Sequence, residues 1–274
     1  MKRIKQLLRP LVRRTLTPRE VQVLRFRIWF LSSYVPRLIL SRLVRRTPQV
    51  QAFGAQVASN LAKQIQTVNV VAPTEMCRVM TRWGSDKGFH AYTPVYSVLF
   101  SARRNQPLKV LELGLGSNNL DVLSNMGVFG APGASLRGWR QLFPHALVYG
   151  ADIDRGILFE EDRIKTYYCD QLDRSSIQDL WSQPELREGM DIIIEDGLHT
   201  LEANLSFLEE SLEHLRPNGI YVTEDISSDC LGQWRQKLDS TYSKNFPRHE
   251  FALTVLTGKG DGNLLLIRRS GDLA

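Results

Sequence analysis

The chain has 274 residues, of which 43% are hydrophobic, enough for the core of one α/β domain and an accessory segment. Its three cysteines are odd in number and show no C-x-x-C spacing, so the sequence indicates a reducing cytosol rather than a disulfide framework or a thiolate zinc site. Residues 1–46 hold 13 of the 35 Lys and Arg but only one acid, which leaves 22 basic and 28 acidic residues in the rest. This acidic body lacks the basic clusters that neutralise phosphates, so the sequence predicts no nucleic-acid partner.

Residues 1–48 predict a basic, amphipathic, helical arm, in which Arg alternates with Leu, Val, Ile, Phe and Trp. Its longest apolar stretch, residues 28–40, contains Pro36 and Arg37 and is shorter than the ~20 residues that span a bilayer. Arg residues also interrupt every stretch that could form a signal peptide. Two roles stay open: residues 1–46 bind the anionic inner face of the cell membrane, or they pack on protein, including a second subunit of a homo-oligomer. We expect a cytoplasmic protein, peripheral on that membrane under the first role.

Residues 49–80 predict a helical linker with a break at Pro73, and residues 81–274 predict the catalytic domain. Strand-like runs then alternate with helical ones, and the strands are expected at residues 108–114, 146–153, 163–170, 190–197 and 219–226. Helices are expected at residues 135–143 and 174–181 and after His199, and a closing hairpin surrounds the turn "TGKGDGN". This alternation predicts a Rossmann-like α/β fold with a mostly parallel seven-stranded sheet and helices on both faces.

Polar residues end the first three predicted strands, where ligands bind in sheets of this kind. Gly114 and Gly116, in "LELGLGSNN", permit a tight turn and the approach of a ligand to the backbone. Asp152 suits the two hydroxyls of a ribose, and Asp170 with Gln171 can hydrogen-bond an adenine edge. The third glycine of the dinucleotide fingerprint G-x-G-x-x-G is absent, so an adenosyl ligand without a pyrophosphate, S-adenosylmethionine, fits better than NAD.

Carboxylates end the next two predicted strands. Asp196 follows "DIIIE", and Glu224 and Asp225 stand in "YVTEDI", so adjacent strands would bring three acids to one edge of the sheet. Three acids repel one another unless a cation neutralises them, and oxygen ligands favour Mg²⁺. His199, three residues past Asp196, is placed to act as a general base on a hydroxyl beside the metal. The alternative is that these acids cap helices or face water.

A set of ordered motifs resembles one known family. "SDKGFHAYTPVY", "LELGLGSNN", "GASLRGWRQLFP", "YGADID", "CDQLD", "DIIIEDGLH" and "YVTEDI" follow the order seen in Mg²⁺-dependent S-adenosylmethionine sugar O-methyltransferases of the macrocin and mycinamicin type. The resemblance covers about residues 80–268 and excludes the arm. It implies methyl transfer to a hydroxyl of a sugar, in a glycolipid, a surface glycan or a glycosylated natural product.

The resemblance also implies roles for individual residues. His199 corresponds to the family's catalytic His, and Asp196, Glu224 and Asp225 correspond to its metal ligands. The cofactor segments contain Thr93, Glu112, Gly114, Gly116, Ser117, Ser135, Asp152, Asp170 and Gln171. This chain departs from the family's D-D-G-S-H motif, with Glu195 for the first Asp and Leu198 for Ser, and it inserts "LDVLSNMGVFGAP" before Ser135. The acceptor therefore stays open.

Two other functions remain as alternatives. An Fe(II)-dependent hydroxylase of the cephalosporin hydroxylase-like group would use the same oxygen-rich site, although a triad of two His and one carboxylate is normal for that chemistry. A non-catalytic, membrane-associated scaffold would need neither the acids nor His199.

Overall fold

The computed structural model describes residues 47–53, 59–70, 73–88, 90–255 and 262–271. The basic arm predicted over residues 1–48 lies almost entirely outside the described residues, so its helical and amphipathic character stays a prediction.

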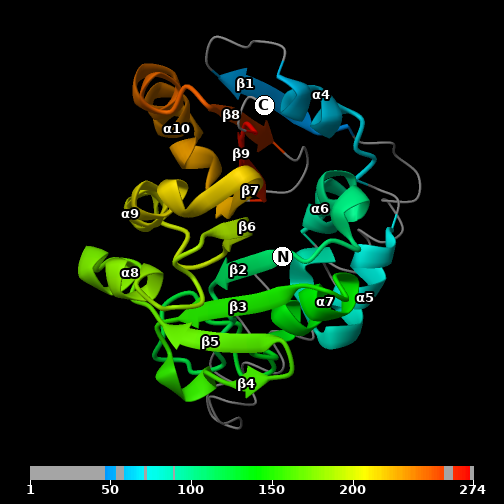
Figure 1. Ribbon diagram of the computed structural model, residues 1–274, viewed down its shortest axis with the longest axis vertical. Coiled ribbons are helices and arrows are strands. Elements are labelled where there is room, and N and C mark those ends of the chain that lie inside the picture. Colours follow the sequence, from blue (N-terminus) through cyan, green and yellow to red (C-terminus); the bar gives the residue numbers. More distant parts are fainter. Residues whose placement is uncertain (1–46, 54–58, 71–72, 89, 256–261, 272–274) are drawn as a thin grey trace, which may run out of the picture.

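One twisted, mixed sheet forms the centre of the described structure (Figure 1). Its strands lie in the order β1-β8-β9-β7-β6-β2-β3-β5-β4. Five adjacent strands are parallel: β7 (Leu215–Ile226), β6 (Met190–Glu195), β2 (Lys109–Leu113), β3 (Leu147–Asp152) and β5 (Ile164–Tyr168). The others are antiparallel to their neighbours: β1 (Gln49–Phe53), β4 (Glu160–Glu161), β8 (His249–Val255) and β9 (Asn263–Arg269). The predicted Rossmann-like fold is confirmed, with two edge strands more than expected.

The segment from residue 49 to residue 80 differs from the predicted helical linker. Gln49–Phe53 forms β1, which pairs antiparallel with β8, because its Val and Phe side chains suit a half-buried edge strand. Two helices follow, α4 (Asn60–Gln66) and α5 (Glu75–Trp83), and the second begins after the predicted break at Pro73. Leu61 and Ile65 of α4 are fully buried in the main core. The described part of this segment is therefore built into the same fold as the strands and helices that follow it.

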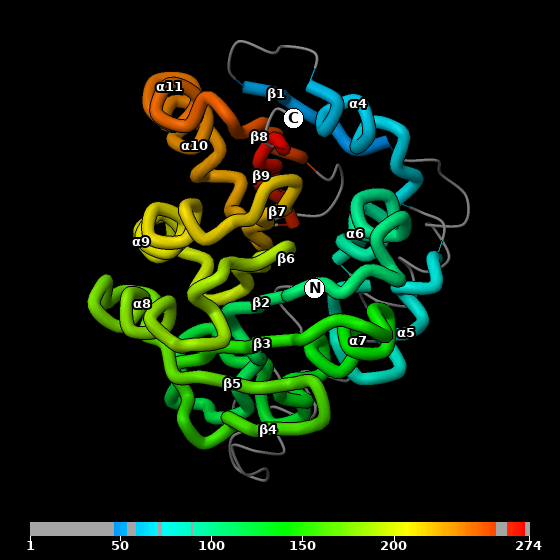
Figure 2. The backbone as a smooth tube through the Cα atoms, viewed as in Figure 1, coloured from blue at the N-terminus to red at the C-terminus, as the bar shows by residue number. Residues whose placement is uncertain are grey.

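Helices cover both faces of the sheet (Figures 1 and 2). One face packs against α4, α5, α6 (Tyr92–Phe100) and α7 (Ala134–Leu142). The other packs against α8 (Arg174–Trp181), α9 (Leu201–Ser211), α10 (Leu231–Lys237) and α11 (Ser243–Asn245). Shorter helical turns lie at Asp86–Gly88, Ser101–Arg103, Arg155–Ile157, Leu212–His214, Ser228–Cys230 and Leu238–Tyr242. The alternation of strand side chains explains both cores: in β6, Ile192 and Ile194 face the first layer and Ile193 faces the second.

Strand β2 marks the point where the strand order reverses. From β2 the chain passes through α7 to β3 and then to β5, and α8 carries it back to β6 on the other side of β2. The carboxyl ends of β2, β3, β5, β6 and β7 consequently share one edge of the sheet, as predicted, and a ligand crevice is expected there. Within the described residues, we find no helix long and apolar enough to cross a membrane.

His249, at the start of β8, makes the stability of the fold sensitive to mild acid. Its ring packs against Phe246 and Phe251, and both ring nitrogens are buried without a hydrogen-bond partner among the described residues. Burial, aided by the positive charge of Arg269, lowers the pKa of His249 to about 4. The folded state therefore resists a proton that the unfolded chain accepts near its ordinary pKa of about 6.5.

We expect the free energy of unfolding to fall as the pH drops from about 7 to about 5, by about 1–2 kcal/mol after solvent screening of this half-buried ring. Urea denaturation at the two pH values measures the loss, and His249→Phe, which has no proton to bind, should reduce it. Equal pH dependence in the wild type and the variant would contradict this assignment.

Candidate active site

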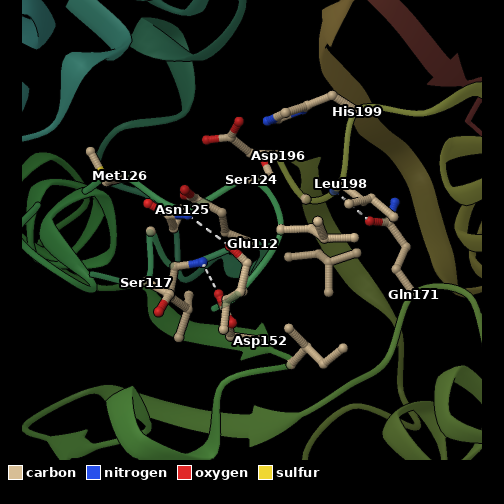
Figure 3. Close-up of a pocket in the computed structure, with 18 of the residues that line it drawn as sticks. Glu112, Ser117, Ser124, Asn125, Met126, Asp152, Gln171, Asp196, Leu198 and His199 are labelled. Atoms are coloured by element: carbon tan, nitrogen blue, oxygen red, sulfur yellow. Dashed lines mark hydrogen bonds between the residues drawn. The ribbon is translucent and has the colours of Figure 1, made fainter. Parts of the chain in front are cut away.

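A cavity of about 490 Å³ lies at the carboxyl edge of the parallel strands (Figure 3). The ends of β2, β3, β5 and β6 line it, together with residues 121–126 of the predicted insertion and Asp225 near the end of β7. In Figure 3, Asp196 and His199 lie together at one end, and Ser117 and Asp152 lie at another. The cavity thus collects side chains from strands far apart in the sequence.

The glycine turn after β2 shapes the floor of this cavity. Gly114 and Gly116 have φ values of 90° and 78°, which L side chains rarely adopt. A Cβ on Gly114 would lie 2.0 Å from the carbonyl oxygen of Asp196, and one on Gly116 would lie 2.1 Å from Sδ of Met126. Absence of a side chain therefore lets the turn contact the Asp196 backbone on one side and the insertion on the other.

Three predicted cofactor residues line the cavity at the ends of β2, β3 and β5: Ser117, Asp152 and Asp170. Asp152 accepts hydrogen bonds from the backbone N–H groups of Leu115 (2.7 Å) and Asp154 (2.8 Å), which fix its carboxylate. Burial raises the pKa of Asp152 above its ordinary value, although those hydrogen bonds oppose the shift. Each carboxylate oxygen keeps a second lone pair, so both can still accept hydroxyl protons from a ligand.

Glu112 and Ser135 also line the cavity, but their side chains are hydrogen-bonded to each other. Ser135 donates to Oε1 of Glu112 at 2.6 Å, and the indole N–H of Trp139 donates to Oε2. Glu112 is fully buried, and burial raises the pKa of its carboxyl group. The pair therefore fixes α7 against β2 beneath the cavity.

The structure differs from the sequence prediction for Thr93. Its side chain is fully buried in α6, its hydroxyl lies 2.8 Å from Sγ of Cys77, and it is not among the described residues that line the cavity. The physical reason is the helical spacing, which turns Tyr92 and Tyr96, four residues apart, toward the acids instead.

Asp196, His199 and Asp225 form a group whose ligand atoms lie within 4.8 Å of one another at one end of the cavity. Asp196 is fixed through its backbone N–H, which donates to the carbonyl of Leu113 at 2.9 Å. His199 and Asp225 both have left-handed backbones, with φ values of 61° and 51°. Such conformations are uncommon outside glycine, and surrounding structure must enforce them.

Glu224, the third predicted metal ligand, lies deeper than this group. Its side chain is 1% exposed, and it accepts hydrogen bonds from the ammonium of Lys87 at Oε2 (2.8 Å) and from the hydroxyl of Tyr96 at Oε1. Both carboxylate oxygens are thus engaged within the protein. Glu224 would ligate a metal through the second lone pair of one of these oxygens, and this role stays a prediction.

Lys87, in the short helical turn before α6, is the central cation of the site. Its ammonium lies 2.6 Å from Asp196 Oδ2, 2.8 Å from Glu224 Oε2 and 3.3 Å from Glu112 Oε1, and the residue is 2% exposed. Burial would lower the pKa of this ammonium, but the three carboxylates hold it well above its usual range. Lys87 therefore stays charged and ties three strands together.

The site contains more carboxylates than the single Lys87 ammonium can neutralise, and together with burial this excess raises their pKa values. Burial raises the pKa of Asp196 and raises that of Glu224 well above its ordinary value, and each of these two carboxylates shifts further because negative neighbours lie close. The Lys87 ammonium only partly offsets this effect. Since Asp225 adds a further carboxylate, the site carries negative charge that a divalent cation would balance.

The sequence analysis missed Lys87, Tyr92 and Tyr96 as residues of the site. Tyr92 donates its hydroxyl proton to Oδ1 of Asp225, and Tyr96 donates to Glu224. A usable signal existed, because "SDKGFHAYTPVY" puts a lysine before a helix that presents two tyrosines at an i, i+4 spacing. The repulsion between three acids called for a cation, and a buried lysine supplies one.

The fold and the site define a class of protein. The MycE methyltransferase of the mycinamycin biosynthetic pathway, solved in complex with Mg and SAH, superposes with a TM-score of 0.55 over 80% of this chain and 64% of that chain, at 24% identity. A second structure of the same protein, solved with Mg, SAH and mycinamycin VI, gives a TM-score of 0.53. This chain therefore has a Rossmann-like methyltransferase fold.

Relatives of known activity show which methyltransferases this chain resembles in sequence. The 8-demethyl-8-alpha-L-rhamnosyl tetracenomycin-C 2'-O-methyltransferase of Streptomyces olivaceus is 34% identical over 148 residues, 54% of this chain and 36% of the relative. The demethylmacrocin O-methyltransferase of Streptomyces fradiae is 36% identical over 146 residues, 53% of this chain and 33% of the relative. The resemblance to sugar O-methyltransferases is thus confirmed. The alignments span about a third of each relative's length, and no family model matches the chain.

Proposed function

We propose that the protein is a metal-dependent O-methyltransferase that moves a methyl group from S-adenosylmethionine to a hydroxyl of a sugar. The observation that carries the proposal is the group of Asp196, His199 and Asp225, which opens into a cavity lined by the glycine turn and by acids at strand ends. Catalysis of this kind needs a cation, a base and a cofactor pocket side by side, and this group with its cavity offers candidate ligands for the cation, an imidazole as the base and space for the cofactor.

The residues of the group fit Mg²⁺. The two carboxylates offer oxygen ligands and leave the imidazole of His199 to act as the base, no Cys belongs to the group, and the negative charge around Lys87 favours a divalent cation. Asp225 Oδ1 is held by Tyr92 and Asp196 Oδ2 by Lys87, so each carboxylate is oriented through one oxygen. One His in the group favours this chemistry over the Fe(II) hydroxylase, which normally uses two.

The cavity fits S-adenosylmethionine. Its volume of about 490 Å³ falls in the range of about 300–1,000 Å³ typical of small-molecule pockets. Gly114 and Gly116 line the cavity without side chains, so the backbone of the turn faces the space that a ligand would occupy. Asp152 would receive the ribose hydroxyls, and Asp170 lies at the adjacent strand end for the adenine.

S-adenosylmethionine supplies an electrophilic methyl group, and Mg²⁺ supplies Lewis acidity that favours loss of the acceptor's proton. Asp196 and Asp225 would hold the cation, with Glu224 as the predicted third ligand. An imidazole nitrogen of His199 would take the proton from the acceptor hydroxyl, whose oxygen then bonds to the methyl carbon as the carbon–sulfur bond breaks. Residues 121–126 and the glycine turn would exclude water from the reacting atoms.

The acceptor is proposed to be a sugar-containing molecule. The relatives are named for rhamnosyl tetracenomycin and demethylmacrocin, and MycE has been solved with mycinamycin VI. A glycosylated natural product is therefore the first acceptor class to test, followed by glycolipids and surface glycans.

Asp196→Ala is expected to abolish methyl transfer and divalent-cation binding because it removes the carboxylate that Lys87 orients. The affinity for SAH, the demethylated product of the cofactor, should change by no more than about threefold, since the cofactor uses a neighbouring part of the cavity. Electron paramagnetic resonance of Mn²⁺ and calorimetry of SAH measure the two effects separately. Full turnover in excess EDTA would refute the metal's role.

The arm supports a further proposal about location. Thirteen basic residues against one acid in residues 1–46 could contribute about 1 kcal/mol for each basic group that reaches an anionic membrane. We propose that the arm holds this protein at the inner face of the cell membrane, with packing on a second subunit as the alternative role.

The full chain is expected to co-sediment with phosphatidylglycerol liposomes, and salt should weaken the binding because it screens the attraction. A chain that begins at Thr47, just before β1, should stay folded, bind SAH and no longer sediment. If the shortened chain instead changes its subunit number while the full chain ignores liposomes, the arm is a packing element.

A further inference from the structure

Gln171 and Glu195 form a buried pair that the proposed reaction does not use directly. Gln171, after β5, donates from Nε2 to Oε1 of Glu195 at 2.7 Å, and the two residues are 6% and 0% exposed. The carbonyl oxygen of the same Gln171 amide accepts the backbone N–H of Leu198 at 2.9 Å. One side chain thus bridges the end of β6 and the loop that follows it.

Close packing shows that this bridge is built into the loop. A Cβ on Gly197 would lie 2.2 Å from Oε1 of Gln171, so a larger residue there would displace the amide from this position. The N–H of Gly197 also donates to Oε1 of Glu195 at 3.3 Å. Glu195 and Leu198 are the two positions at which the chain departs from the family's motif, and here they take part in one set of hydrogen bonds.

His199 lies immediately after this bridge. Its backbone is left-handed, with a φ of 61°, and its Nδ1 is buried without a hydrogen-bond partner among the described residues. On its other side, Thr200 caps α9 by accepting the N–H of Ala203. The backbone of His199 is therefore fixed from both neighbours, by Gln171 before it and by the helix cap after it, whereas Nδ1 makes no hydrogen bond to a described residue that would hold the ring.

We infer that Gln171 is a positioning residue for His199 and that Glu195 orients it, rather than Gln171 serving mainly to bind the adenine. This inference rests on the proposed function only for the role of His199 as the base. In Figure 3, Gln171 lies beside Leu198, on the other side of the cavity from Ser117, Asn125 and Met126. A loss of the bridge would free the loop and misplace the imidazole, and a shift of about 1 Å can cost about a hundredfold in rate.

An exchange of the two side chains tests the bridge. In Gln171→Glu two carboxyl groups meet, which should break the hydrogen bond between positions 171 and 195. Gln171→Glu combined with Glu195→Gln reverses the donor and the acceptor of this bond. In the double variant, the side chain at position 171 can still accept the N–H of Leu198. Glu195→Gln alone keeps an acceptor for Gln171 and serves as the mild control. Nuclear magnetic resonance of the ¹⁵N-labelled imidazole of His199, assigned with His199→Gln, reports the ring's environment without an acceptor.

We expect Gln171→Ala and Gln171→Glu to shift the His199 signals while the dissociation constant of SAH stays within about threefold of the wild-type value. The exchanged pair should restore the wild-type signals. Unchanged signals with a more than about tenfold loss of SAH affinity would make Gln171 an adenine contact and overturn the inference. Failure of the exchanged pair to restore the signals in a folded protein would also overturn it. If the wild type binds no SAH, the proposed function fails, while the His199 signals still decide the role of the bridge.

Discussion

Lys87→Met is expected to destabilise the protein by about 3–5 kcal/mol, because it leaves a buried cluster of carboxylates without their cation. The ammonium is within 3.3 Å of Glu112, Asp196 and Glu224, and the methylenes of Met would fill the same space without the charge. Urea denaturation measures the loss. Mg²⁺ should restore more stability to the variant than it adds to the wild type, since a cation that binds only the folded state stabilises it.

Lys63→Met provides the matched control, because Lys63 is exposed on α4 and should contribute within about 0.5 kcal/mol. If Lys87→Met is as stable as Lys63→Met, the ammonium does not hold the acids together. If Lys87→Met is destabilised and Mg²⁺ does not restore its stability, the carboxylates around Lys87 are not the site that binds the cation.

Gly114→Ala should impair both ligand sites at once. The left-handed backbone at a φ of 90° costs an L residue about 1–2 kcal/mol, and the added Cβ would lie 2.0 Å from the carbonyl oxygen of Asp196. Because this contact is with backbone, relief requires the turn after β2 to move away from the end of β6. We therefore expect weaker binding of SAH and of Mn²⁺ together, whereas Asp196→Ala affects only the metal.

Gly232→Ala is the control for this prediction. Gly232 lies inside α10 with nothing within 4 Å of an added Cβ, so alanine should stabilise the protein by about 0.5–1 kcal/mol through its helix propensity. Calorimetric titrations of the two variants give the comparison. Normal affinity for both ligands in Gly114→Ala would show that the turn tolerates displacement and does not set the position of Asp196.

The sequence predicted the parallel part of the fold because most of its strands contain an apolar run that is followed by a polar residue. Ile192 to Ile194 followed by Asp196 shows the pattern: both sheet faces are covered by helices, and the acid lies at the ligand edge. Strand β1 escaped prediction because an edge strand of five residues gains its stability from pairing with β8, roughly 200 residues later in the chain.

For a related reason, the sequence predicted that the acids of the site lie together, but it did not reveal Lys87 between them. Carboxylates at strand ends share an edge by topology alone, which needs no knowledge of side-chain contacts. Lys87 reaches Asp196 and Glu224 across 109 and 137 residues of sequence, and no periodic pattern reports such an ion pair. Gln171 was likewise predicted to contact the cofactor because it follows a strand end. Its hydrogen bonds to Glu195 and Leu198 depend on how two loops pack, which the sequence pattern does not show.

The central claim is methyl transfer to a sugar hydroxyl with the help of a divalent cation. Its most direct test is to incubate the full chain with Mg²⁺, S-adenosylmethionine carrying a deuterated methyl group and a mixture of rhamnosylated polyketides, and to fragment the products by mass spectrometry. We predict a deuterated methyl group on the sugar fragment, absent with EDTA or with Asp196→Ala. Transfer that EDTA leaves unchanged, or label found only on the polyketide, would contradict the account.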